Sequence, residues 1–167
     1  YTSHWRGKAM GEFFWSNLFK KLMRRLKETI RGCTYSKDDL EKALNELGAQ
    51  LPISLRSFYL ENTGQKFYEN KFLEYKIAGW FNVKAGKCEE EQIGMSLQET
   101  FNHSREFIPG DLIPFAYNDL NDYYLIAITD GIYFLRNDMI YNEIGALVKI
   151  ADSFEEFING LKAEERT

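Results

Sequence analysis

The stretch from Leu112 to Leu135 constrains the fold more than any other part of this sequence, because it holds three short apolar runs in close succession. Polar breaks separate these runs, which cover residues 112–117, 123–128 and 132–135. The second break contains Asp130-Gly131, a dipeptide that favours a tight hairpin between β-rich segments, and Gly131 can adopt the positive φ that such turns need. The pattern therefore predicts three adjacent antiparallel strands at the centre of one sheet.

The composition indicates one globular domain with a sizeable core. The chain has 167 residues, of which 44% are hydrophobic and 16% aromatic, and this length is typical of a single domain. No apolar run approaches the roughly 18 residues of a membrane span, and residues 1–10 lack the apolar core of a signal peptide. Cys33 and Cys88 form no metal-type pair, so we expect free thiols in a reducing compartment and a cytoplasmic location.

A basic segment precedes an acidic body. Residues 1–37 carry nine Lys or Arg and two Glu, a net charge of +7, whereas residues 38–167 carry a net charge of −11. Within the basic part, residues 13–31 have the apolar periodicity of an amphipathic helix. Such a helix packs on a domain, lies on a membrane surface or contacts nucleic acid. The acidic body argues against nucleic-acid contact, and packing on the domain is the favoured interpretation. This predicts one structural unit made of a helical segment 1–35 and a domain 36–167.

Helix and strand signals alternate through the rest of the chain. Capping residues, apolar spacing or a first-turn proline predict helices that begin near Ser36, Ile53, Ser96 and Asp152. Aromatic-rich alternation predicts one or two strands within 67–83, and a last strand is predicted at 146–150. The fold class is therefore α+β, with a single, mainly antiparallel sheet that N-terminal and C-terminal helices cover.

The sequence contains no recognisable catalytic or metal motif. Only His4 and His103 titrate near neutral pH without a perturbed environment, and both positions suit a structural role. There is no phosphate-binding glycine loop, no nucleophile elbow and no cluster at metal-ligand spacing. A nucleophilic pair of Cys88 and His103 is conceivable, but their spacing does not favour it. We therefore expect no enzyme activity, no catalytic or metal-binding residues and no cofactor.

Acidic residues recur in the predicted turns, at Asp119, Asp122, Asp130 and Asp138. Asp is common in turns because its side chain hydrogen-bonds the local backbone, and this is the interpretation that the pattern favours. Two alternatives remain open. Paired carboxylates could perform acid–base chemistry or hold a cation, and an acidic surface could attract a basic partner.

The order and spacing of these elements resemble the SUKH superfamily, which groups yeast cell-wall-synthesis regulators with bacterial toxin-immunity proteins. The resemblance covers about residues 36–162 and is carried by turn formers, helix caps and core residues in Leu51–Gly64, Ile113–Ala116, Asp122–Leu125, Asp130–Phe134 and Ile150–Phe157. The chain departs from the usual family pattern at 118–121, where members often carry a glycine-rich turn, and in the basic segment 13–31.

The resemblance implies a SUKH-like fold and a binding module rather than an enzyme. It implies an immunity protein that neutralises a cognate toxin of a polymorphic or contact-dependent system, such as a basic nuclease, with no direct contact to nucleic acid or membrane. The alternative is a regulatory scaffold that binds cellular proteins. Loops on a rigid sheet commonly carry recognition residues. The predicted partner surface is acidic and loop-borne, with flanking tyrosines: Glu89, Glu90, Glu91, Tyr117, Asp119, Asp122, Asp138 and Tyr141.

Overall fold

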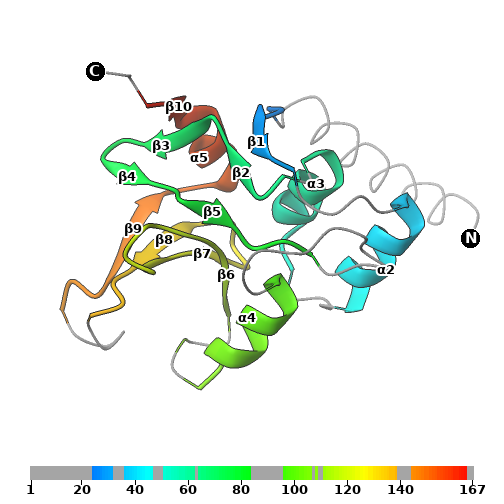
Figure 1. Ribbon diagram of the computed structural model, residues 1–167. Coiled ribbons are helices and arrows are strands. Elements are labelled where there is room, and N and C mark those ends of the chain that lie inside the picture. The colour runs from blue at the N-terminus through cyan, green and yellow to red at the C-terminus, as the bar shows by residue number, and fades with distance from the viewer. Residues whose placement is uncertain are drawn as a thin grey trace, which may run out of the picture.

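A five-stranded antiparallel sheet forms the middle of the fold in the computed structural model of the protein (Figure 1). Its strands lie in the order β5, β6, β7, β8, β9, so strands that follow one another in the sequence are also neighbours in space. They span Gly79–Trp80, Leu112–Tyr117, Tyr123–Ala127, Ile132–Leu135 and Leu147–Ala151. The prediction of three adjacent central strands is therefore confirmed. The last strand lies one residue further along the chain than predicted.

The structure describes the chain in eight segments: residues 24–31, 36–46, 51–62, 64–83, 96–106, 108, 111–138 and 144–164. The segment 13–23, the run Glu89–Glu91, Tyr141 and both cysteines fall outside these segments. Within them, no helix combines the length and the apolar character that crossing a bilayer requires.

Strand β7 is buried on both faces. Tyr124 and Ile126 pack into the main core between the sheet and the helices. Leu125 packs on the opposite face, in a smaller cluster with Leu112 and Leu135. A strand that is covered on both sides reads as an unbroken apolar run rather than as an alternating one, which is the pattern found at 123–128.

The β7–β8 hairpin turns through Asp130 rather than through Gly131. Asp130 has a φ of 78°, a conformation that Asp tolerates because its short polar side chain bonds locally. The Asp130 amide donates to the Ala127 carbonyl at 2.8 Å, and the Ala127 amide donates to the Gly131 carbonyl at 2.9 Å. The predicted tight hairpin is confirmed, but the left-handed residue is the aspartate, so the prediction of a positive φ at Gly131 is wrong.

Two small sheets accompany the main one, so the prediction of a single sheet is wrong. The first sheet pairs β1 with β2, at Glu28–Ile30 and Lys66–Phe67. The second places β3 between β10 and β4, at Glu69–Phe72, Leu161–Ala163 and Tyr75–Lys76. A turn at Leu73, which has a φ of 51°, separates β3 from β4. Since no glycine or proline marks that turn, the sequence reads as a continuous alternating segment.

The predicted helix over 13–31 is wrong in its described part. Residues 24–27 are not helical, and β1 begins at Glu28. The Gln65 amide donates to the Ile30 carbonyl at 2.9 Å, and the Leu26 amide donates to the Asn62 side chain at 3.0 Å. These long-range hydrogen bonds replace helical ones. The β-branched Thr29 and Ile30 favour the extended backbone as well.

The four helices in the described segments begin where the sequence predicts. They are α2 (Lys37–Glu46), α3 (Ile53–Glu61), α4 (Leu97–Ser104) and α5 (Phe154–Gly160). The hydroxyl oxygens of Ser36, Ser96 and Ser153 each accept a hydrogen bond from a first-turn amide at 3.0–3.2 Å, which satisfies a backbone donor that the helix itself leaves free. Leu161, predicted on the last helix, is buried but begins β10.

Aromatic side chains fill the space between the main sheet and the helices. The Phe58 ring of α3 stacks on Trp80 of β5, with centroids 4.4 Å apart, and Trp80 lies 5.2 Å from Phe115 of β6. Phe154 and Phe157 of α5 meet Phe115 edge-on at 5.6 and 5.7 Å. Each favourable ring pair adds about 0.5–1.5 kcal/mol beyond the area it buries. This cluster therefore joins α3 and α5 to the main sheet.

Tyr124 connects the main sheet to the small three-stranded sheet. Its buried hydroxyl donates a hydrogen bond to the Lys76 carbonyl of β4. Burial, and then the charges of Asp122 and Tyr75, raise the pKa of Tyr124 well above its usual value. The phenol of the unfolded chain loses its proton first, near about pH 10, so the full contribution of Tyr124 to the free energy of unfolding is present below that pH. This contribution falls as the pH rises toward the higher pKa of the folded state.

Tyr124→Phe is expected to lower the free energy of unfolding by about 1–2 kcal/mol at neutral pH, because the Lys76 carbonyl loses its hydrogen-bond donor. The difference from the unsubstituted protein should shrink above about pH 10, where only the tyrosine form loses stability by deprotonation. Urea unfolding of both proteins at neutral pH and at about pH 10.5 measures this. A difference that stays constant over that range contradicts the assignment.

Candidate protein-binding cleft

The residues predicted to bind a partner divide into two sets. Four lie outside the described segments: Glu89, Glu90, Glu91 and Tyr141. The structure places the other four at the end of β6, in the β6–β7 turn and in the turn after β8: Tyr117, Asp119, Asp122 and Asp138. These four have different surroundings, so the structure separates residues that a sequence pattern treats as equivalent.

Asp122 is a buried turn residue that joins two loops. It is 9% exposed. One carboxylate oxygen accepts from the Asn137 amide at 2.7 Å, and the other accepts from the Asn118 side chain at 2.9 Å. The Asn118 side chain in turn accepts from the Asp122 amide at 2.8 Å. The Asp122 carboxylate is therefore used within the fold, as the turn-former interpretation expects.

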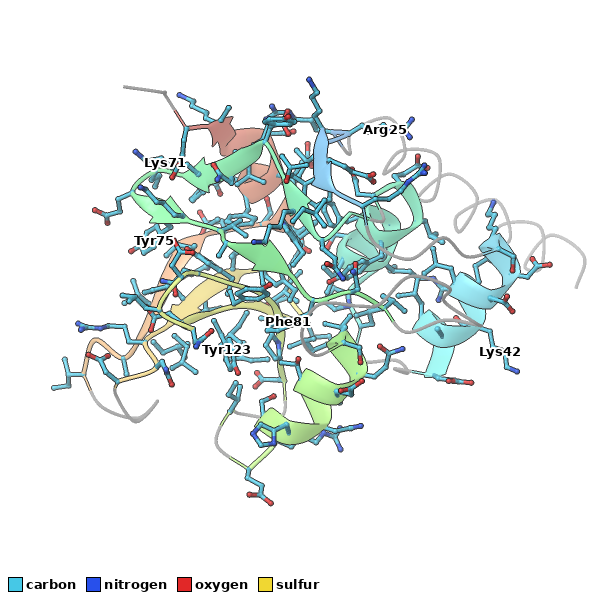
Figure 2. The ribbon with its side chains drawn as sticks, in the orientation of Figure 1. Arg25, Lys42, Lys71, Tyr75, Phe81 and Tyr123 are labelled. Carbon is cyan, nitrogen blue, oxygen red and sulfur yellow. The ribbon has the colours of Figure 1, made fainter. Side chains whose placement is uncertain are left out.

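Asp138 and Tyr117 are partly engaged with their neighbours. Asp138 is exposed and pairs with Arg136 at 3.0 Å, a surface contact that contributes little to stability. The Phe81 ring contacts the rings of Tyr117 and Tyr123, at centroid distances of 5.1 and 5.8 Å. Figure 2 shows Phe81 and Tyr123 side by side. Burial raises the pKa values of both tyrosines.

Glycine at position 79 allows the Tyr117 side chain to cross β5. A Cβ atom at Gly79 would lie 2.4 Å from the Tyr117 hydroxyl oxygen and 2.6 Å from the adjacent ring carbon, far inside van der Waals contact. Any larger residue would displace the ring. The β5–β6 pairing therefore fixes Tyr117 beside the turn that carries Asp119.

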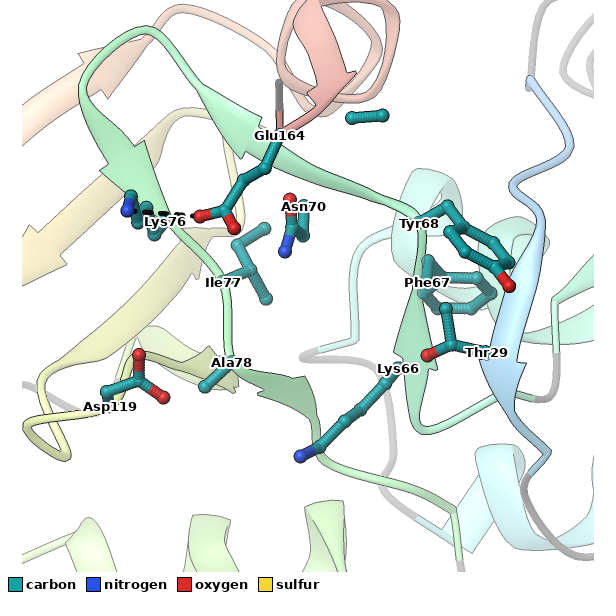
Figure 3. Close-up of a pocket in the computed structure, with 11 residues that line it drawn as sticks. Thr29, Lys66, Phe67, Tyr68, Asn70, Lys76, Ile77, Ala78, Asp119 and Glu164 are labelled. Atoms are coloured by element: carbon teal, nitrogen blue, oxygen red, sulfur yellow. Dashed lines mark ion pairs between the residues drawn. The ribbon is translucent and has the colours of Figure 1, made fainter. Parts of the chain in front are cut away.

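Asp119 is exposed and lines a cleft of about 380 Å³ between the small sheets and the β6–β7 turn (Figure 3). The cleft has an apolar floor that includes Phe67 and Ile77, both 4% exposed. Its polar lining comes from several elements: Thr29, Lys66, Asn70, Lys76, Asp119 and Glu164. One predicted binding residue thus belongs to a concave surface, which is a usual form of recognition site.

The charged groups of the cleft have two kinds of environment. Lys76 of β4 pairs with Glu164, which follows β10, at 3.1 Å. Lys66 of β2 and Asp119 extend toward each other from opposite sides of the mouth (Figure 3). Neither of these two has an ion pair or a side-chain hydrogen bond to any residue that the structure describes. They remain available to a bound group.

Asn70 lines the same cleft, but its side-chain oxygen lies below the cleft surface. Its side-chain oxygen is inaccessible to solvent and has no hydrogen-bond partner within the described segments. Its backbone carbonyl is already used, since it accepts from the Ile77 amide at 2.7 Å. A buried polar atom without a partner is costly, but a molecule in the cleft cannot reach this oxygen, because it is inaccessible to solvent.

Within the described segments, no group of three or more His, Cys, Asp or Glu residues is placed to hold a metal ion. Of the turn aspartates, Asp122 and Asp130 have their carboxylates engaged with the backbone of other segments. The chemistry that the cleft offers is hydrogen bonding and charge recognition.

Sequence reasoning identified Asp119 but missed Lys66, Asn70, Lys76 and Glu164 as members of the same site. These residues come from β2, β3, β4 and the segment after β10. Each is a single polar residue in a short strand or at a strand end, and no local pattern marks it. Only the pairing of β10 with β3 brings the C-terminal segment to the cleft.

Comparison with known proteins identifies a match to one protein family. The model of the SMI1 / KNR4 family (SUKH-1) matches residues 34–160, a span that runs from the start of α2 to the end of α5. The searches of curated proteins and of solved structures found no match. The matched span contains most of the cleft but not Thr29, Ala163 or Glu164, so residues on either side of it complete the cleft walls.

Proposed function

Because the chain belongs to the SMI1/KNR4 family (SUKH-1), we propose that it is a non-catalytic, cytoplasmic binding protein that neutralises a cognate bacterial toxin. The family match over residues 34–160 carries the proposal, since the superfamily includes toxin-immunity proteins. The cleft beside Asp119 supports it, because the cleft offers unpaired polar groups on a rigid sheet. Such surfaces can vary in sequence without loss of the core.

The negative charge of the domain supports the proposal that the partner is a basic protein. Residues 38–167 carry a net charge of −11, and nucleases hold phosphates with basic active sites. Opposite charges on two proteins raise the rate of encounter and fix the orientation of docking. The proposed contact surface includes Tyr117, Asp119 and Asp138, with Glu89–Glu91 and Tyr141 as further members. Asp122 contributes by holding the turn.

The test of this function uses the protein whose gene lies directly upstream of the gene for this chain. Expression of that protein alone should arrest growth, and co-expression of the intact chain should restore growth and give a complex that co-elutes on size exclusion. A harmless upstream protein, or growth arrest despite folded chain, overturns the immunity function. A stable complex with a harmless protein would favour the regulatory scaffold.

Asp119→Lys is expected to slow association with the partner by about 10-fold at low salt, because it reverses a charge at the contact surface. The effect should fade at high salt, where charges are screened. Glu46→Lys is the matched control, since it makes the same charge change at an exposed position on α2. Helix α2 lies apart from β2, β3 and β4, which line the cleft (Figure 1). Stopped-flow association rates for both variants measure the effect, and equal rates would exclude Asp119 from the contact.

A further inference from the structure

The polar groups of the cleft differ in which ligand they can accept. The Lys76–Glu164 pair is satisfied internally at 3.1 Å, so it closes one wall and leaves no free charge there. The remaining charged groups are a cationic donor at Lys66 and an anionic acceptor at Asp119, and the hydroxyls of Thr29 and Tyr68 can donate or accept. A ligand must therefore match one charged donor and one charged acceptor.

A charged group of either sign fits this set poorly. A lysine or arginine from a partner that reached Asp119 would also face Lys66 across the mouth (Figure 3). A carboxylate that reached Lys66 would face Asp119. Like charges that share a site repel, and partial burial strengthens the repulsion because the local dielectric is lower than that of water.

An amide group fits the set without such repulsion. Its N–H can donate to Asp119, and its carbonyl can accept from Lys66. The volume of about 380 Å³ holds on the order of ten water molecules at about 30 Å³ each, which is room for a short loop segment. Phe67 and Ile77 supply an apolar floor for the carbon atoms of that segment.

We propose that the cleft binds a loop of the partner protein through an uncharged amide, which Lys66 holds at the carbonyl and Asp119 holds at the N–H. This inference rests on the proposed function, since it names the part of the partner that the cleft recognises. The general acidity of the domain steers a basic partner, whereas the cleft selects a neutral group within it.

The test measures the affinity of the intact chain for the partner by titration calorimetry, with Lys66→Met, Asp119→Ala and the double variant. Each single substitution should weaken binding by about 10-fold or more, as expected for the loss of a hydrogen bond to a charged group. The double variant should lose less than the product of both losses, because one amide contacts both residues. Lys42→Met, on the exposed face of α2 (Figure 2), is the control and should bind normally.

The other outcomes show which part of the proposal is wrong. Tighter binding by Lys66→Met together with weaker binding by Asp119→Ala means that the cleft takes a cationic side chain, and the reverse pattern means an anionic one. Either result overturns the amide proposal. Unchanged affinity of both variants removes the cleft from the interface while the proposed function stands, whereas no binding by the unsubstituted chain refutes the proposed function itself. If both single variants weaken binding, alanine replacement of Asn and Gln residues in the partner loop shows whether the amide is a side chain or the backbone.

Discussion

Replacing Phe58 by alanine is expected to lower the free energy of unfolding by about 3–5 kcal/mol, the usual range for removal of a fully buried aromatic side chain. Phe58 is 0% exposed. Its ring stacks on Trp80 at 4.4 Å and meets Phe67 and Phe154 edge-on at 5.9 and 5.6 Å. The substitution therefore leaves a cavity where α3, the main sheet, α5 and β2 meet.

Guanidinium unfolding followed by tryptophan fluorescence measures this effect, because Trp80 is a direct neighbour of the lost ring. Ile53→Ala on the same helix is the control. Ile53 is 60% exposed, and exposed substitutions usually change stability by less than about 0.5 kcal/mol. Similar losses for the two variants would mean that α3 does not pack through Phe58.

Asp130→Ala is expected to lower the free energy of unfolding by about 2–4 kcal/mol. The Asp130 carboxylate accepts from the buried Ser54 hydroxyl of α3 and from the Phe154 amide of α5 at 3.2 Å, and hydrogen bonds to charged groups contribute about 1.5–3 kcal/mol. Alanine also tolerates the φ of 78° less well than aspartate, which adds about 1 kcal/mol.

Asp130→Asn separates these causes, because asparagine also adopts the left-handed backbone readily and retains one carbonyl acceptor. Asp130→Asn should lower the free energy of unfolding clearly less than Asp130→Ala does in the same denaturation experiment. Asp152→Ala, at an aspartate whose side chain is 86% exposed, controls for the loss of a surface carboxylate. If Asp130→Ala lowers the free energy of unfolding no more than Asp152→Ala does, the hairpin does not hold α3 and α5 together through Asp130.

The central strands and the helix starts were predictable because their signals are local. Apolar runs of strand length and serine caps depend only on neighbouring residues, and β6, β7 and β8 begin at the predicted residues. The choice between Asp130 and Gly131 as the left-handed residue was not predictable. It depends on hydrogen bonds from Ser54 and Phe154, which are distant in the sequence.

The small sheets and most of the site depend on long-range pairing. The apolar periodicity through Ile30 is helical, yet β1 pairs with residues more than thirty positions away, and tertiary contacts override local propensity in such short segments. In the same way, Asp119 and Asp122 look alike in the sequence. The structure buries Asp122 against Asn137 and exposes Asp119 at the cleft, a difference that only the fold creates.

The most direct measurement of the central claim is a titration of the purified upstream protein's toxic activity with the intact chain. Binding at the cleft predicts that the activity falls in proportion to added chain and disappears at an equimolar ratio, and that Asp119→Lys shifts the titration to higher concentrations while Glu46→Lys does not. Full activity in the presence of excess folded chain, at concentrations where size exclusion shows a complex, would contradict the account and would make the chain a binding scaffold rather than an inhibitor.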